Sequence, residues 1–129
     1  MTAPDDDVVE LATMMFGLAR DGDTETLAAY VAAGVPPNLT NESGDTLVML
    51  AAYHGHADTV TALLTAGADP NRGNDRGQTP IAGAVFKGET DVVKALLAGG
   101  ADPAAGSPSA IATAQMFGQT ELLALFERH

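Results

Sequence analysis

Two histidines and an aspartate form the cluster in this sequence that comes nearest to a metal site. His54, His56 and Asp58 supply three potential ligands within five residues. They lie on both sides of Gly55, where a helix is expected to end, so they do not share one helix face as the ligands of a helical zinc motif do. We therefore expect no bound metal and no cofactor.

Carboxylate and hydroxyl side chains offer a second route to chemistry. Asp21 with Asp23, or Asp45 with Asp75, would form acid–base pairs if they lined a pocket. The serines have no histidine and acid in a recognisable nucleophile arrangement; these serines are Ser43, Ser107 and Ser109. We expect the carboxylates to be solvated charges that keep the protein soluble, and we expect no catalytic residues and no enzyme activity.

The charge balance excludes several classes of partner. Seventeen acidic and six basic residues give a formal net charge of -11, which repels nucleic acid and anionic membrane surfaces. Cysteine is absent, so disulfides and thiolate metal sites are excluded. The start of the chain is acidic where a signal peptide is positive, and no apolar stretch approaches the length of about 18 residues that spans a membrane. We expect a cytoplasmic protein that binds neither nucleic acid nor membranes.

The elements that must position the polar residues follow a fixed period. Three series of residues recur at intervals of 33, namely Gly22, Gly55 and Gly88; Gly34, Gly67 and Gly100; and Thr13, Thr46 and Thr79. A period of about 20 to 50 residues indicates a solenoid of stacked units. The scarcity of aromatic residues and the abundance of Ala and Gly favour closely stacked helices.

Each period is predicted to contain two helices. Apolar stretches at 46–52 and 59–64 stop near Gly55 and Gly67, and glycine ends helices readily because it adopts the left-handed conformation. Glu25 and Asp58 lie near the start of second helices, where they complement the positive end of the helix dipole.

Turn-forming residues separate one period from the next. The segment from Asn71 to Thr79 predicts a protruding hairpin-like loop, and the segment from Asn41 to Thr46 predicts another. Thr46 and Thr79 stand where an N-terminal cap is needed, and Pro80 follows at the first helical position, where its missing N–H costs nothing.

These motifs resemble those of the ankyrin repeat family. Residues 75–81 read DRGQTPI, Gly88 follows, and residues 92–102 read VVKALLAGGAD. The preceding period matches through Gly44, Thr46, 51–52, Gly55-His56, 63–64 and 67–71. The resemblance covers Val8 to Phe126. It implies an all-α solenoid of four helix-turn-helix repeats in a single domain, residues 1–129, with repeats at about 8–40, 41–73, 74–103 and 104–129 and with the first and last as caps.

The sequence departs from the family pattern in three ways. The histidine that ends the family's T-P-L-H motif is replaced by Phe16, Met49, Ala82 and Ala112, so the loop hydrogen bonds of that histidine are expected to be missing. The fourth repeat has lost three residues between Ala104 and Ser109, which predicts a short or absent hairpin. The first repeat lacks a hairpin and is expected to begin with a long helix from Val8 to Arg20. Gly17 and Gly83 fall at equivalent positions inside first helices, at a cost of about 1 kcal/mol each relative to Ala.

The ankyrin fold would direct the hairpin loops and the C-terminal ends of the first helices into one groove. Tyr, Phe, Met and Arg are typical anchors of protein interfaces, and several of them fall at these positions. The candidate partner-binding residues are Arg20, Glu42, Ser43, Asp45, Tyr53, His54, Asp75, Arg76, Gln78, Phe86, Lys87, Met116 and Phe117. Three of the six basic residues belong to this set, so the groove is expected to be less acidic than the rest of the protein.

The function expected from this pattern is binding of a partner protein through the groove by a monomeric module. A different interpretation is that Tyr53 and Phe86 pack across adjacent repeats and that Met116 and Phe117 cap the last repeat. A rival function is that of an acidic antagonist or immunity-type protein that masks a basic site on an enzyme, toxin or DNA-binding protein. Residues 5–7, all Asp, could contact a basic partner, although they more simply form a frayed tail that complements a helix dipole.

Overall fold

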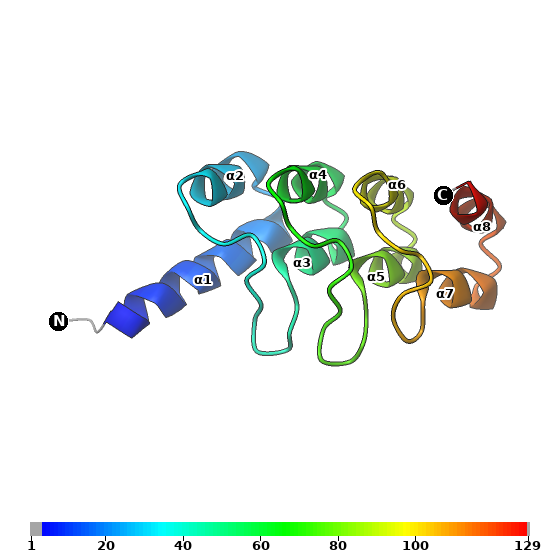
Figure 1. Cartoon of the computed structure of the whole chain (residues 1–129), viewed down its shortest axis with the longest axis horizontal. Coiled ribbons are helices and arrows are strands. Elements are labelled where there is room, and N and C mark those ends of the chain that lie inside the picture. The colour runs from blue at the N-terminus through cyan, green and yellow to red at the C-terminus, as the bar shows by residue number, and fades with distance from the viewer. Residues whose placement is uncertain (1–3, 129) are drawn as a thin grey trace.

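Eight helices are arranged in pairs along a solenoid. The computed structural model describes the backbone of residues 4–128 and the side chains of residues 8–128. The helices are α1 (Pro4–Asp21), α2 (Thr24–Ala32), α3 (Leu47–Tyr53), α4 (Ala57–Thr65), α5 (Pro80–Lys87), α6 (Thr90–Ala98), α7 (Ala110–Met116) and α8 (Thr120–Glu127). Figure 1 shows an inner layer of α1, α3, α5 and α7 and an outer layer of α2, α4, α6 and α8. The predicted all-α solenoid is confirmed.

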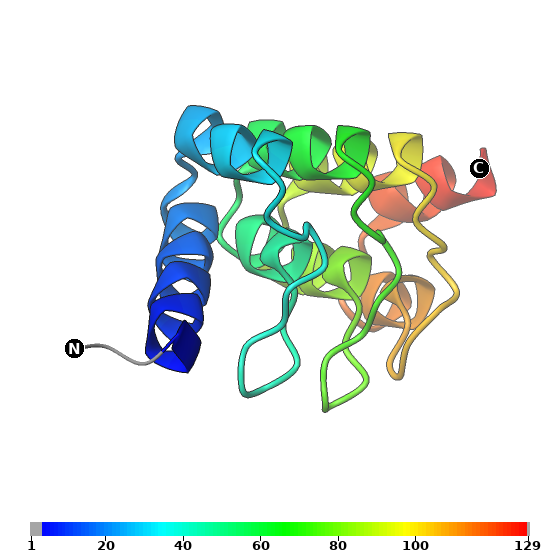
Figure 2. The same ribbon diagram turned by 60° about the vertical axis from the view of Figure 1, so that its left-hand side comes forward.

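Loops project from the inner layer on the side away from the outer layer. In Figures 1 and 2 the loops before α3 and α5 extend well beyond the inner helices, whereas the loop before α7 is shorter. Their strand character is limited to isolated bridges, between Thr40 and Thr46 and between Gly106 and Ser109, in the part of the chain that the structure describes. The last loop is therefore short, as the loss of three residues predicts.

Side-chain caps start the inner helices after each loop. The hydroxyl of Thr46 accepts a hydrogen bond from the N–H of Met49 at 3.0 Å, and that of Thr79 accepts one from Ala82 at 3.3 Å. Ser109 caps α7 in the same way. These bonds satisfy N–H groups that the first helical turn leaves without partners. The predicted caps at Thr46 and Thr79 are confirmed.

The first helix differs from the prediction in its length. It begins at Pro4 rather than Val8 and ends at Asp21 rather than Arg20, so residues 5–7 form part of its first turn. Pro4 occupies a position where a proline's missing N–H costs nothing, and carboxylates in the first turn favour the helix. Thr13 consequently lies inside α1, where its hydroxyl donates to the carbonyl of Val9, and it caps no helix.

Small residues allow the inner helices to stack closely. Residues 47–52 of α3 and 80–85 of α5 are all buried, because each helix has neighbours on both sides and an outer helix behind it. A Cβ atom on Gly83 would lie 3.1 Å from Met49 Cε and 3.6 Å from Tyr53 Cδ2, whereas one on Gly17 would meet nothing within 4 Å. Gly83 thus serves the contact between α3 and α5, and Gly17 serves no comparable contact.

Other hydrogen bonds link the loops that lack the family's histidine. The N–H of Asp75 donates to the carbonyl of Ser43 at 3.0 Å, and the N–H of Ser107 donates to the carbonyl of Gly77 at 3.1 Å. The Asn74 side chain also bridges two loops, because its Nδ2 donates to Asp45 Oδ1 at 2.8 Å. Successive loops are therefore connected by backbone and amide groups.

The first prediction concerns the two helical glycines. Gly17→Ala should raise the free energy of unfolding by about 1 kcal/mol, because alanine favours the helix and its methyl group meets no neighbour. Gly83→Ala should gain clearly less, because Met49 must move to make room. Urea unfolding of both variants measures the difference, and equal gains would contradict the proposed contact between α3 and α5.

The second prediction concerns the asparagine that bridges two loops. Asn74→Asp should lower the free energy of unfolding by about 1 to 3 kcal/mol at neutral pH, because it replaces the donor to Asp45 with a like charge. The matched control is Asn41→Asp, since Asn41 Oδ1 accepts from the N–H groups of Ser43 and Asp45 and a carboxylate can accept the same bonds. Thermal melts of the two variants should differ, and similar losses would show that the link to Asp45 adds no stability.

Candidate functional site

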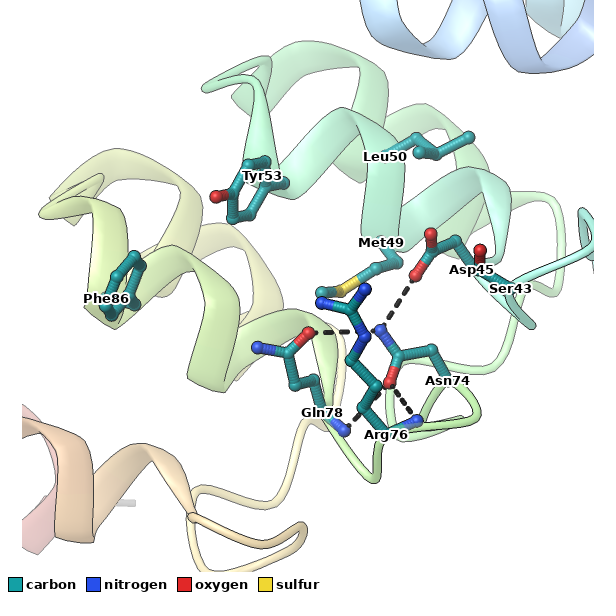
Figure 3. Close-up of a pocket in the computed structure, with 9 residues that line it drawn as sticks. All are labelled: Ser43, Asp45, Met49, Leu50, Tyr53, Asn74, Arg76, Gln78 and Phe86. Atoms are coloured by element: carbon teal, nitrogen blue, oxygen red, sulfur yellow. Dashed lines mark hydrogen bonds between the residues drawn. The ribbon is translucent and has the colours of Figure 1, made fainter.

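A depression of about 280 Å³ lies on the face formed by the loops and the inner helices. Figure 3 shows the side chains that line it, which come from α3, α5 and the two longer loops. They are Ser43, Asp45, Met49, Leu50, Tyr53, Asn74, Arg76, Gln78 and Phe86. Six of these nine belong to the predicted partner-binding set, so the structure brings nearly half of that set around one hollow.

Three residues of the depression were missed by the sequence analysis. Met49 and Leu50 are buried members of α3, and Asn74 belongs to the second long loop. Met49 stands where the family pattern has histidine, and this departure from the pattern was a signal that could have identified it as a lining residue. Leu50 and Asn74 gave no such signal, because an apolar helix residue and a turn-forming asparagine are each explained by local structure alone.

Hydrogen bonds fix the polar wall of the depression. Asn74 Oδ1 accepts from the backbone N–H groups of Arg76 and Gln78, both at 3.0 Å, and Asn74 Nδ2 donates to Asp45 Oδ1 and to Gln78 Oε1. The asparagine side chain thereby uses its donors and acceptor within the loops. The wall is held in one arrangement before any partner arrives.

Aromatic and long side chains line up at the C-terminal ends of the inner helices, in what we term the helix-end row. Its members are Tyr53, Phe86, Lys87, Met116 and Phe117. Lys87 Nζ lies 5.0 Å from the centroid of the Tyr53 ring, within the range of a cation–π contact. The rings of Phe86 and Phe117 meet edge to face with centroids 5.8 Å apart.

The two sequence interpretations of the helix-end row each describe part of it. Tyr53 is half-buried and packs beside Gly83 of the next repeat, in line with packing across repeats. Phe86 and Phe117 touch each other but stay 57% and 52% exposed, and Met116 is 71% exposed. The phenylalanine and methionine side chains therefore present apolar surface that the described residues do not cover.

The remaining predicted residues lie outside the depression. Arg20 and Glu42 line a separate hollow of about 620 Å³ between α1 and the first long loop, and Ser43 borders both hollows. His54 is exposed, and its ring meets the Tyr53 ring edge to face with centroids 5.8 Å apart. Asp75 lies at the tip of the second long loop, where its side chain covers Gly44.

One of the two histidines of the candidate metal cluster, His56, makes a structural contact. His56 Nε2 lies 2.7 Å from the carbonyl oxygen of Arg20, and the ring occupies the space where Gly22 has no side chain. Within the described residues, no three His, Cys, Asp or Glu side chains are grouped so as to hold a metal ion. The same part of the chain contains no helix long and apolar enough to cross a membrane.

Comparison with known proteins places this geometry in a family. A family model described as "Ankyrin repeats (3 copies)" matches residues 15–107. A Pseudomonas aeruginosa protein whose name describes it as ankyrin repeat protein PA3287 is 48% identical over 45 residues, which are 35% of this chain and 26% of that protein. The chain thus spans well under two thirds of that relative's length. Since the family model covers most of the chain and the helix pairs and loops agree with it, the chain belongs to the ankyrin repeat family.

Proposed function

We propose that the chain binds a partner protein through the depression and the helix-end row. Ankyrin repeats generally are protein–protein interaction modules. The observation that carries the proposal is the exposed apolar surface of Phe86, which lines the depression, and of Phe117, which contacts Phe86, together with the exposed Met116 at the end of α7. These are three of the six large hydrophobic residues that are exposed in the described part of the chain.

Exposed aromatic and methionine side chains that gather on one face indicate an interface. Single exposed apolar residues are common on soluble proteins, but a contiguous group of them is not. Phe86 and Phe117 are in contact, and Phe86 also lines the depression. A partner side chain entering the hollow would therefore meet an aromatic wall on one side and polar groups on the other.

The surface is arranged before binding. Asn74 holds the polar wall, and Lys87 rests on the Tyr53 ring. Side chains that are already ordered lose less conformational entropy when a partner binds. More of the free energy of the contacts with a partner is therefore available for binding affinity.

The distribution of carboxylates favours this face over an acidic masking surface. The outer helices carry acidic residues in their first turns, one in each repeat, at Glu25, Asp58, Asp91 and Glu121. A carboxylate in that position stabilises its own helix through the dipole. This role accounts for the spread of acidic residues along the outer layer without a basic partner.

The third prediction tests the proposed anchors. Phe86→Ala and Tyr53→Ala should each weaken partner binding by about 1 kcal/mol or more, because truncation removes an aromatic contact from the centre of the interface. Affinity capture with the intact protein identifies the partner, and calorimetric titration then measures each variant.

Two controls separate binding from folding. Val8→Ala removes an equally exposed apolar side chain that does not line the depression, and it should leave affinity unchanged. Melting curves show whether Tyr53→Ala, which also removes packing against the next repeat, remains folded at the assay temperature. Full affinity in both aromatic variants would refute the assignment of the site.

A further inference from the structure

Beyond α1, which itself carries carboxylates such as Glu10 and Asp21, charge in the solenoid is separated by layer. The inner helices α3, α5 and α7 contain no Asp or Glu, and Lys87 is their one charged residue. The outer helices α2, α4, α6 and α8 each contain at least one carboxylate. The floor of the binding face is therefore apolar and locally positive in a chain whose formal net charge is -11.

Two cations border the apolar strip of the helix-end row. Lys87 Nζ is held over the Tyr53 ring next to Phe86, and a contact of this kind leaves the ammonium group able to donate hydrogen bonds. Arg76 is exposed at the rim of the depression, and its guanidinium donates no hydrogen bond to the residues that the structure describes. Both cations are available to an incoming carboxylate.

The carboxylates of the same face belong to the loops and not to the helix ends, and Asp45 among them lines the depression together with Arg76. Asp45 accepts the hydrogen bond from Asn74, and Glu42 and Asp75 belong to the long loops. Glu89, which follows Lys87 closely in sequence, packs its carboxyl group over Gly55 at the end of α3. The strip from Tyr53 to Phe117 thus carries lysine and aromatic side chains but no carboxylate of its own.

We propose that the partner supplies an acidic segment with a large apolar side chain, an inference that rests on the proposed function. The apolar side chain lies against Phe86 and Phe117 or enters the depression. That hollow, at about 280 Å³, is near the lower limit for small-molecule sites and is better suited to one side chain. A neighbouring carboxylate of the segment pairs with Lys87, and a second one pairs with Arg76.

The negative charge of the whole chain does not prevent this mode of binding. Most of the carboxylates lie on the outer layer and the loops, and repulsion between exposed charges is largely screened beyond about 8 to 10 Å at physiological salt. Contacts with Lys87 and Arg76 act at hydrogen-bonding distance, where screening is weak. Lys87 and Arg76 therefore favour segments in which carboxylates flank an apolar side chain.

The fourth prediction is tested by selection from a library of random short peptides displayed on phage, with the full chain as bait. We expect the selected peptides to combine Asp or Glu with Leu, Phe or Trp. The best peptide should bind the Lys87→Gln, Arg76→Gln double variant about five- to tenfold more weakly, as expected for two exposed ion pairs. The matched control is Lys94→Gln, Arg128→Gln, which removes the same charge from α6 and from the residue that follows α8, and it should leave affinity unchanged.

A double-mutant cycle attributes the loss to the proposed pairs. Replacing each Glu of the peptide by Gln should weaken binding to the natural chain but should have little effect on the Lys87→Gln, Arg76→Gln variant. If basic or uncharged peptides are selected, and if these peptides do not bind the Phe86→Ala variant, the inference is overturned. The proposed function then still stands. Peptides that bind the Phe86→Ala variant as tightly as the natural chain, or a library that yields no binder, would overturn both the inference and the proposed function.

Discussion

The close approach of α3 to α5 is the constraint on which the binding face depends. Gly83 leaves room for Met49 Cε, which would lie only 3.1 Å from a methyl group at this position, and it lets the Tyr53 ring pack beside α5. Because these two residues keep their places, Met49 lines the floor of the depression and the Tyr53 ring can lie under Lys87. The glycine that weakens α5 as an isolated helix thereby sets the spacing between two repeats. Local helix propensity and tertiary packing favour different residues at this position, and packing prevails.

The loops of this chain are connected by hydrogen-bonding groups other than the histidine of the family pattern. Ankyrin repeats that carry the T-P-L-H histidine have a side chain available for bonds between loops, and this chain has Met49 and Ala82 at two of those positions. Backbone bonds from Asp75 to Ser43 and from Ser107 to Gly77, together with the Asn74 amide, connect the loops instead. Buried methionine in place of a polar ring also extends apolar surface into the depression. The substitution thus changes the chemistry of the face while the loops stay connected.

The sequence predicted the elements better than it predicted the site. Periodicity, caps at Thr46 and Thr79 and the turn glycines located the helix pairs, because those signals act within a few residues. The extra turn of α1 was missed, since an acidic start fits a tail as well as a first helical turn. Leu50 and Asn74 were missed as lining residues because the hollow is created by elements of two different repeats, and no local pattern records it. The contact between Lys87 and Tyr53 joins two repeats, so it could not be predicted from the sequence of either repeat alone.

The shortened loop before α7 makes the two ends of the binding face unequal. Beside α3 and α5 the face is bordered by extended loops, whereas beside α7 the border is low (Figure 1). A bound segment can therefore contact a deeper loop wall beside α3 and α5 than beside α7. A bound chain therefore has a preferred orientation, because its two ends meet borders of different height.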